Sequence, residues 1–137
     1  MSSANEEIAR KAMEAYNQGD RDAWFLLHDP DLEFRAASSW PESETIRGRQ
    51  PVWDWVARMS DAWEPDEFEM SEVRESGEKL VGRARRPVKG KASGIADVLD
   101  QWTVATIRHG RVVRQEWFTS RSDAVKTAGR SESSDPL

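Results

Sequence analysis

The sequence of 137 residues contains no cysteine. This absence excludes disulfide bonds, thiolate metal sites and cysteine nucleophiles, and it fits a reducing compartment such as the cytoplasm. Long apolar runs are also missing: none approaches the roughly 20 residues that span a bilayer, and the N-terminus lacks the basic and apolar regions of a secretory signal. We therefore expect a cytoplasmic protein without a membrane partner.

The sequence has only two histidines, and its net charge is negative. The two histidines, His28 and His109, lie far apart in turn-like sequence, which disfavours a histidine metal site and a Ser-His-Asp triad. Asp29 and Asp31 are typical of a turn, so His28 is interpreted as structural or at the surface. The formal net charge of −5 disfavours a general nucleic-acid binder. We expect no metal, no cofactor and no nucleic-acid partner.

Tryptophan is abundant, with seven residues against one tyrosine. Such bulky rings occur mostly in a core, an interface or an aromatic pocket, and the sequence leaves these three alternatives open. Length and composition, with 37% hydrophobic and 33% charged residues, fit one globular domain, which we assign to residues 1–129. The polar residues 130–137 are expected to form a disordered tail.

Capping and breaking residues predict four helices. The capping-box spacing of residues 3–6 predicts the start of the first helix, and Gly19 its end. Asp20 can cap a short second helix, Pro51 stands where the first turn of a third is expected, and a last helix is predicted over roughly 122–128.

Alternation of apolar and polar residues predicts five strands. The first is "DLEFRAA", and the other four follow as a meander: "EFEMSEVRE", "KLVGRARRPV", "IADVLDQWTVATIRH" and "RVVRQEWFTS". Segregated helices and strands predict an α+β fold, with helices packed on a curved antiparallel sheet that leaves a pocket at its open end.

The order and spacing of several motifs carry a family resemblance. These motifs are "NQGD", "DPDLEF", "RGRQPVWDWV" and "GKASGIAD…RHGRVVRQEWFTSRSDAVKTAG". Together they resemble the SnoaL-like branch of the nuclear-transport-factor-2-like superfamily, which includes ketosteroid isomerase. The resemblance implies a cone-shaped barrel with a deep pocket and a homodimer formed through the convex sheet face. Because this superfamily contains isomerases, cyclases, dehydratases, epoxide hydrolases and non-catalytic binders, the fold does not determine the function.

The family's catalytic positions hold other residues here. By the resemblance, the tyrosine that donates to the oxyanion falls on Ala12, the general base on Arg35, and the protonated acid near Thr103. The aspartate of the cyclases falls near Thr119 or Ser120. If the protein is an enzyme, it does not use the inherited machinery unchanged.

The resemblance also indicates which side chains of the last two long strands point into the pocket. They are Asp97, Leu99, Gln101, Thr103, Ala105, Ile107, Gln115, Trp117 and Thr119. We assign Gln101, Thr103, Gln115 and Trp117 as ligand-binding residues, together with Trp40 in an earlier loop, because a few polar groups among rings suit a small, mostly apolar ligand. The alternative is a set of satisfied core polar groups or a water-filled remnant of a pocket.

Three charged residues are further candidates. Asp97 and Arg35 are the candidate catalytic pair, in which the guanidinium would keep the carboxylate ionised and favour electrostatic stabilisation over proton abstraction. Arg85, in the basic run "GRARRPVKGK", either guards a solvated sheet edge or reaches the pocket and binds an anionic group.

Two functions therefore stay open. The first is a binder of a small, mostly apolar metabolite that, if catalytic, is a cofactor-independent isomerase, cyclase or lyase without the usual base. The second is a non-catalytic binding or dimerisation module. A convex apolar patch of Trp102, Val104 and Phe118 is the predicted dimer contact, because such a surface is seldom left in water.

Overall fold

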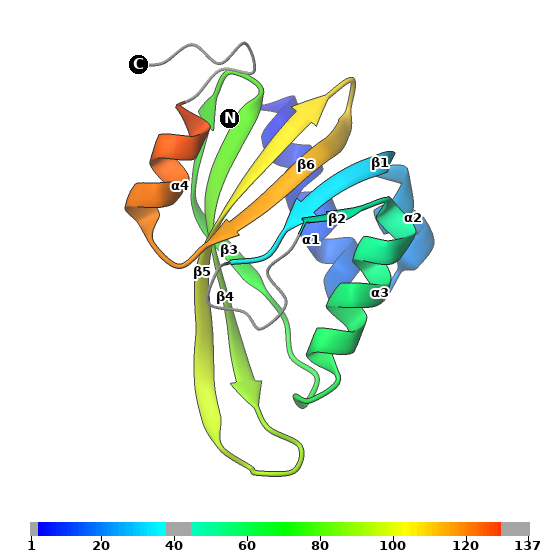
Figure 1. Cartoon of the computed structure of the whole chain (residues 1–137), viewed down its shortest axis with the longest axis vertical. Helices are drawn as coiled ribbons and strands as arrows, with labels where there is room; N and C mark the ends of the chain where they lie inside the picture. Colours follow the sequence, from blue (N-terminus) through cyan, green and yellow to red (C-terminus); the bar gives the residue numbers. More distant parts are fainter. Residues whose placement is uncertain (1–2, 38–44, 130–137) are drawn as a thin grey trace.

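The computed structural model describes residues 3–37 and 45–129 (Figure 1). Trp40 and the predicted tail over 130–137 lie outside the described residues. The elements, in chain order, are α1 (Ala4–Asn17), α2 (Arg21–Leu26), β1 (His28–Arg35), β2 (Thr45–Arg47), α3 (Arg49–Ser60), β3 (Glu69–Ser76), β4 (Lys79–Lys89), β5 (Ala96–Arg108), β6 (Arg111–Phe118) and α4 (Arg121–Ala128).

The strands form one sheet in the order β2-β1-β6-β5-β4-β3. The predicted antiparallel meander is present from β3 to β6, but β1 runs parallel to β6, so the sheet is mixed. A parallel pair needs a long connection between its strands, and here α3 and the first three meander strands provide it. The strand β2 is an addition that alternation did not predict.

Helices lie on both faces of this sheet (Figure 1). Trp24 of α2 and Trp55 of α3 share a buried cluster with Leu32 and Phe34 of β1, on the inner face. On the outer face α4 packs against β4, β5 and β6. The architecture is therefore the predicted α+β fold, in which a curved and unclosed sheet is packed between helices.

The predicted caps are formed. The Ser3 hydroxyl accepts a hydrogen bond from the Glu6 amide at 3.0 Å, and the Asp20 carboxylate accepts one from the Ala23 amide at 3.1 Å. These side chains satisfy amides that would otherwise lack partners in the first turns of α1 and α2.

The stretch "HDPDLEFR" is strand rather than the predicted turn, since β1 begins at His28. Its pairing with β6 is irregular between His28 and Glu33, and Asp29 accepts a hydrogen bond from the Asp31 amide at 2.8 Å inside this bulge. The turn-like chemistry is thus present within a bulged strand. This placement buries His28, which was expected to be structural or at the surface.

The outer apolar patch is covered by the same chain. Val104 is fully buried in a cluster with Ala124 and Ala128 of α4, and Trp102 and Phe118 pack against this cluster. The outward direction of these side chains follows the predicted alternation. Since α4 shields the patch from water, its apolar character no longer requires a second subunit, and the homodimer stays a prediction.

Candidate functional site

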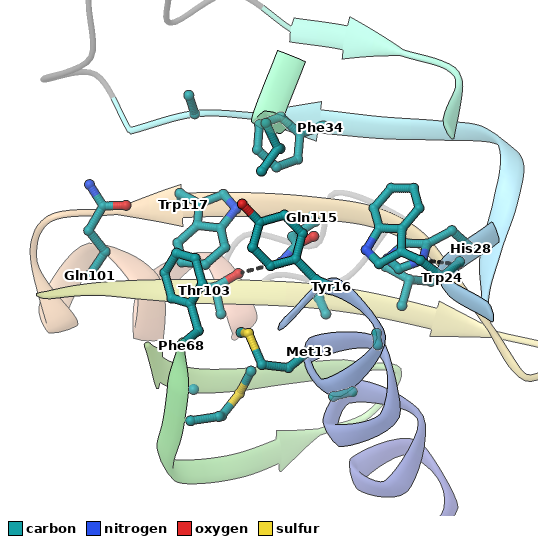
Figure 2. Close-up of a pocket in the computed structure, with 18 of the residues that line it drawn as sticks. Met13, Tyr16, Trp24, His28, Phe34, Phe68, Gln101, Thr103, Gln115 and Trp117 are labelled. Carbon is teal, nitrogen blue, oxygen red and sulfur yellow. Dashed lines mark hydrogen bonds between the residues drawn. The ribbon is translucent and has the colours of Figure 1, made fainter. Parts of the chain in front are cut away.

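A cavity of about 110 Å³ lies between the inner face of the sheet and helices α1, α2 and α3 (Figure 2). Rings make up much of its wall, and they come from Tyr16, Trp24, His28, Phe34, Trp55, Trp63, Phe68 and Trp117. Several tryptophans therefore line an aromatic pocket, which was one of the three alternatives that the sequence left open. Among the described residues, no Asp, Glu, Lys or Arg side chain lines this cavity.

The inward faces of β5 and β6 agree with the predicted alternation. Gln101, Thr103, Gln115 and Trp117 all line the cavity. The Gln115 amide donates to the Thr103 hydroxyl at 3.4 Å (Figure 2). The Trp117 indole N–H is buried without a hydrogen-bond partner in the described part of the chain. A buried donor of this kind can be satisfied by a ligand, so binding by these four residues stays a prediction.

Asp97 and Arg35 lie outside the cavity, and the predicted catalytic pair is not formed. Asp97 is exposed at the start of β5, and its carboxylate accepts from the Val98 amide at 2.7 Å. Pairing with β6 begins only at Trp102, so the first residues of β5 extend beyond the neighbouring strand. Arg35 is exposed because the alternation that turns Phe34 inward turns its neighbour outward.

Arg85 does not line the cavity, so the alternative in which it reaches the pocket is not met. Arg85 is exposed and lies 3.8 Å from the Asp100 carboxylate, and the Arg83 guanidinium lies 2.6 Å from the same carboxylate. Hydrogen bonding to Arg83 lowers the pKa of Asp100. Arg86 instead points to the inner face and is 4% exposed. The alternation of Gly82 and Ala84, small residues buried on that face, continues to Arg86 and is the signal that could have found it.

His28 lines the cavity as a buried and neutral ring. It stacks on Trp24 with 3.7 Å between ring centroids, and its Nδ1 lies 2.7 Å from the Trp24 carbonyl oxygen. Because a carbonyl only accepts, Nδ1 carries the proton and Nε2 is left as an acceptor. Burial lowers the pKa of His28 from 6.5 to about 4, so the ring is uncharged at neutral pH.

Three polar side chains from α1, α3 and β4 form a hydrogen-bonded chain at the cavity wall. The hydroxyls of Tyr16 and Ser60 lie 2.7 Å apart, and Arg86 Nη1 donates to the Ser60 hydroxyl at 3.2 Å. Tyr16 and Ser60 line the cavity, so Arg86 is linked to it through Ser60. Sequence reasoning did not find this chain, because it joins residues 44 and 26 positions apart and has no local pattern.

Within residues 3–37 and 45–129, His, Asp and Glu side chains do not gather in groups of three that could hold a metal ion. None of the helices described above is both long and apolar enough to cross a bilayer.

A curved mixed sheet with helices on both faces and an aromatic cavity on its inner face defines an NTF2-like α+β fold. The model of the SnoaL-like domain matches residues 9–115, and the chain therefore belongs to the SnoaL-like family. This result confirms the resemblance carried by the sequence motifs. No curated protein matches the chain.

Solved structures with low sequence identity share this fold. An NTF2-like protein of unknown function from Burkholderia pseudomallei is 20% identical, with a TM-score of 0.76 over 91% of this chain and 97% of its own. TerC co-crystallised with polyporic acid is 19% identical, with a TM-score of 0.75 over 90% of this chain and 97% of its own. A hypothetical protein with a ketosteroid isomerase-like fold from Catenulispora acidiphila, in complex with trimethylamine, is 17% identical, with a TM-score of 0.71 over 95% and 98%.

Proposed function

We propose that the protein binds a small, mostly apolar, ring-containing metabolite in the cavity between the sheet and helices α1, α2 and α3. The observation that carries this proposal is the wall itself, in which rings from five different elements and from the loop between α3 and β3 surround a few neutral polar groups. A pocket of this kind favours burial of an apolar body and orients it through a small number of hydrogen bonds.

The neutral polar groups are spread around the wall. His28 Nε2 is an acceptor, the Trp117 indole N–H is a donor without a partner among the described residues, and the Gln115–Thr103 pair has further hydrogen-bonding capacity. Structural neighbours support the proposal, since TerC was co-crystallised with polyporic acid and the Catenulispora protein with trimethylamine. These ligands belong to those proteins, and their different chemistry leaves the ligand of this chain open.

Thermal unfolding in the presence of neutral ring compounds tests the proposal. We expect naphthalene, indole or 2-naphthamide to raise the melting temperature, because a ligand at about 100 times its Kd stabilises the folded state by about 2.7 kcal/mol. Ala12→Leu, which adds volume to a residue that lines the cavity, is expected to weaken binding by about tenfold, or about 1.4 kcal/mol.

Ala57→Leu is the matched control, because Ala57 is exposed on α3 and does not line the cavity. It should leave the Kd unchanged. If none of the three compounds shifts the melting temperature, the binding proposal fails and the cavity is a remnant, as in a pure dimerisation module.

A second candidate function is an isomerisation, cyclisation or lyase step on such a ligand. His28 favours it, because a neutral imidazole in a cavity can accept a proton at Nε2 while Nδ1 stays bonded to the Trp24 carbonyl oxygen. Its low pKa makes it a weak base, so it suits only a substrate with an acidic hydrogen.

Turnover of a bound ligand would test this second function. We expect His28→Gln to lower the rate by about 10²-fold or more while binding persists, since general-base contributions are of that size. His109→Gln is the control, because His109 is exposed in the β5–β6 turn. An equal rate in both variants would remove His28 from the reaction. Binding without turnover would identify a non-catalytic binder.

A further inference from the structure

Arg86 differs from the arginines around it because it is buried without a carboxylate partner. It is 4% exposed, and in the described part of the chain no Asp or Glu forms an ion pair with it. Arg83 and Arg85, three residues and one residue earlier, both lie within ion-pair distance of Asp100 at the surface. Taking a charge out of water costs free energy unless a partner compensates it, so the burial of Arg86 needs a physical explanation.

The contacts around Arg86 account for only part of its charge and donors. Its guanidinium carbon lies 5.6 Å from the Trp63 ring centroid and 5.5 Å from that of Phe68, which stabilises the cation. Its one hydrogen bond to the described residues goes from Nη1 to the Ser60 hydroxyl, and its Nε is buried with no partner. A guanidinium carries five N–H donors, so most of those of Arg86 have no acceptor among the residues that the structure describes.

The position of Arg86 connects it to the cavity. Ser60, Trp63 and Phe68, the three residues that contact its guanidinium, all line the cavity. Arg86 also shares the inner face of β4 with Gly82, another lining residue. The cation therefore lies behind the part of the cavity wall that Ser60, Trp63 and Phe68 form, and Arg86 is not itself a lining residue.

The hydrogen-bonded chain from Arg86 through Ser60 to Tyr16 can present a hydrogen-bond donor to the cavity. Arg86 can only donate, so Ser60 accepts from it and can pass its own hydrogen to the Tyr16 oxygen. The Tyr16 hydrogen is then free for a ligand. Figure 2 shows the Tyr16 ring extending from α1 into the cavity, toward the side chains of Gln115 and Trp117. Donors aligned behind a cation favour an acceptor that carries negative charge.

We propose that Arg86, with Ser60 and Tyr16, binds an anionic group of the ligand beside the part of the cavity wall that Trp63 and Phe68 form. The proposal rests on the proposed binding function and narrows it to amphipathic ring compounds that carry a carboxylate or a comparable oxyanion. The rings hold the apolar body, and the buried guanidinium supplies the charge that the lining residues themselves lack.

Calorimetric titration with two matched pairs of probes tests this assignment: benzoate with benzamide, and 2-naphthoate with 2-naphthamide, at pH 7. Within a pair the ring is the same and only the charge differs. We expect the wild-type chain to bind each carboxylate at least about tenfold more tightly than its amide, because charge-assisted hydrogen bonds are the stronger ones. Arg86→Met is expected to abolish this preference, and Arg85→Met, the exposed neighbour, to keep it.

The unfolding of the unliganded proteins separates this role from a structural one. Replacing buried ionic side chains by well-packed apolar ones is often neutral or stabilising, and Arg86 has no carboxylate partner in the described part of the chain, so Arg86→Met should melt at or above the wild-type temperature. If this variant does not fold, Arg86→Gln, which can still donate to Ser60 but has no charge, should lose the preference in its place.

Each other result overturns the assignment. Equal binding of carboxylate and amide by the wild type, or a preference that survives in the uncharged variants, removes Arg86 from the site while the proposed binding function stands. A lower melting temperature of Arg86→Met, together with a carboxylate preference that persists in Arg86→Gln, assigns Arg86 to the core. If neither member of either pair binds, the binding function fails together with the anion site.

Discussion

The chemical environment of His28 differs from the one that the sequence suggested. Its ring is 2% exposed, stacked on Trp24 and bonded through Nδ1 to a backbone carbonyl, so a residue interpreted as structural or at the surface is part of the cavity wall. A neutral buried imidazole keeps one tautomer, which fixes Nε2 as the group that a ligand meets. The hydrogen bond from Nδ1 to the Trp24 carbonyl oxygen thus makes Nε2 the acceptor.

The low pKa of His28 predicts a pH-dependent stability. Between pH 6.5 and about 4 the unfolded chain binds a proton at His28 that the folded chain does not, so the free energy of unfolding should fall as the pH falls through this window. The full difference is about 3 kcal/mol, from about 1.36 kcal/mol for each pKa unit. Denaturant unfolding at pH 7, 5.5 and 4 measures it.

Two variants isolate the contribution of His28 to the pH dependence from that of the other groups of the chain. His28→Gln should lose this part of the pH dependence, and His109→Gln should keep it, because His109 is exposed. Identical pH profiles for the wild type and His28→Gln would show that the ring titrates normally in the folded protein.

At the scale of elements, α4 decides the character of the outer sheet face. Ala124 and Ala128 pack on Val81 and Val104, and this contact buries a patch that alternation alone presents as exposed. Trp102 lies beside it, with the guanidinium carbons of Arg83 and Arg121 at 5.8 and 5.7 Å from its ring centroid. Rings and cations thus cover the edge of the patch within one chain.

Trp102→Glu tests this role of α4. We expect the substitution to lower the free energy of unfolding by about 2 kcal/mol, because it places a carboxylate against the apolar cluster beneath α4. Leu26→Glu is the control, since Leu26 is 71% exposed and its replacement should cost little. Chemical denaturation of both variants measures the difference.

Size-exclusion chromatography of the same variants tests the predicted homodimer. A wild type that elutes as a dimer and a Trp102→Glu variant that elutes as a folded monomer would establish the convex face as the subunit interface. Loss of stability at an unchanged elution volume would assign Trp102 to packing within the chain.

At the scale of the whole molecule, local sequence patterns correctly predicted the features that depend on residues close together in the chain. Caps at Ser3 and Asp20, and the inward set of β5 and β6, follow from hydrogen bonds and side-chain directions that are repeated over a few positions. Predictions failed where a pattern was extended past the point at which the sheet supports it. Asp97 has the predicted alternation, but it lies near the start of β5, where β6 is not beside the strand, and it does not line the cavity.

The sequence by itself determined the helices, the long strands, the family and the face to which most side chains of each strand point, because these depend on local spacing and on motif order. Only the tertiary structure decided which of those faces enclose a cavity, that α4 covers the outer patch, and that His28 and Arg86 are buried. The physical reason is that burial depends on what packs above a residue. The elements that do so here, such as α3 over β1 and α4 over β5, are distant in the chain.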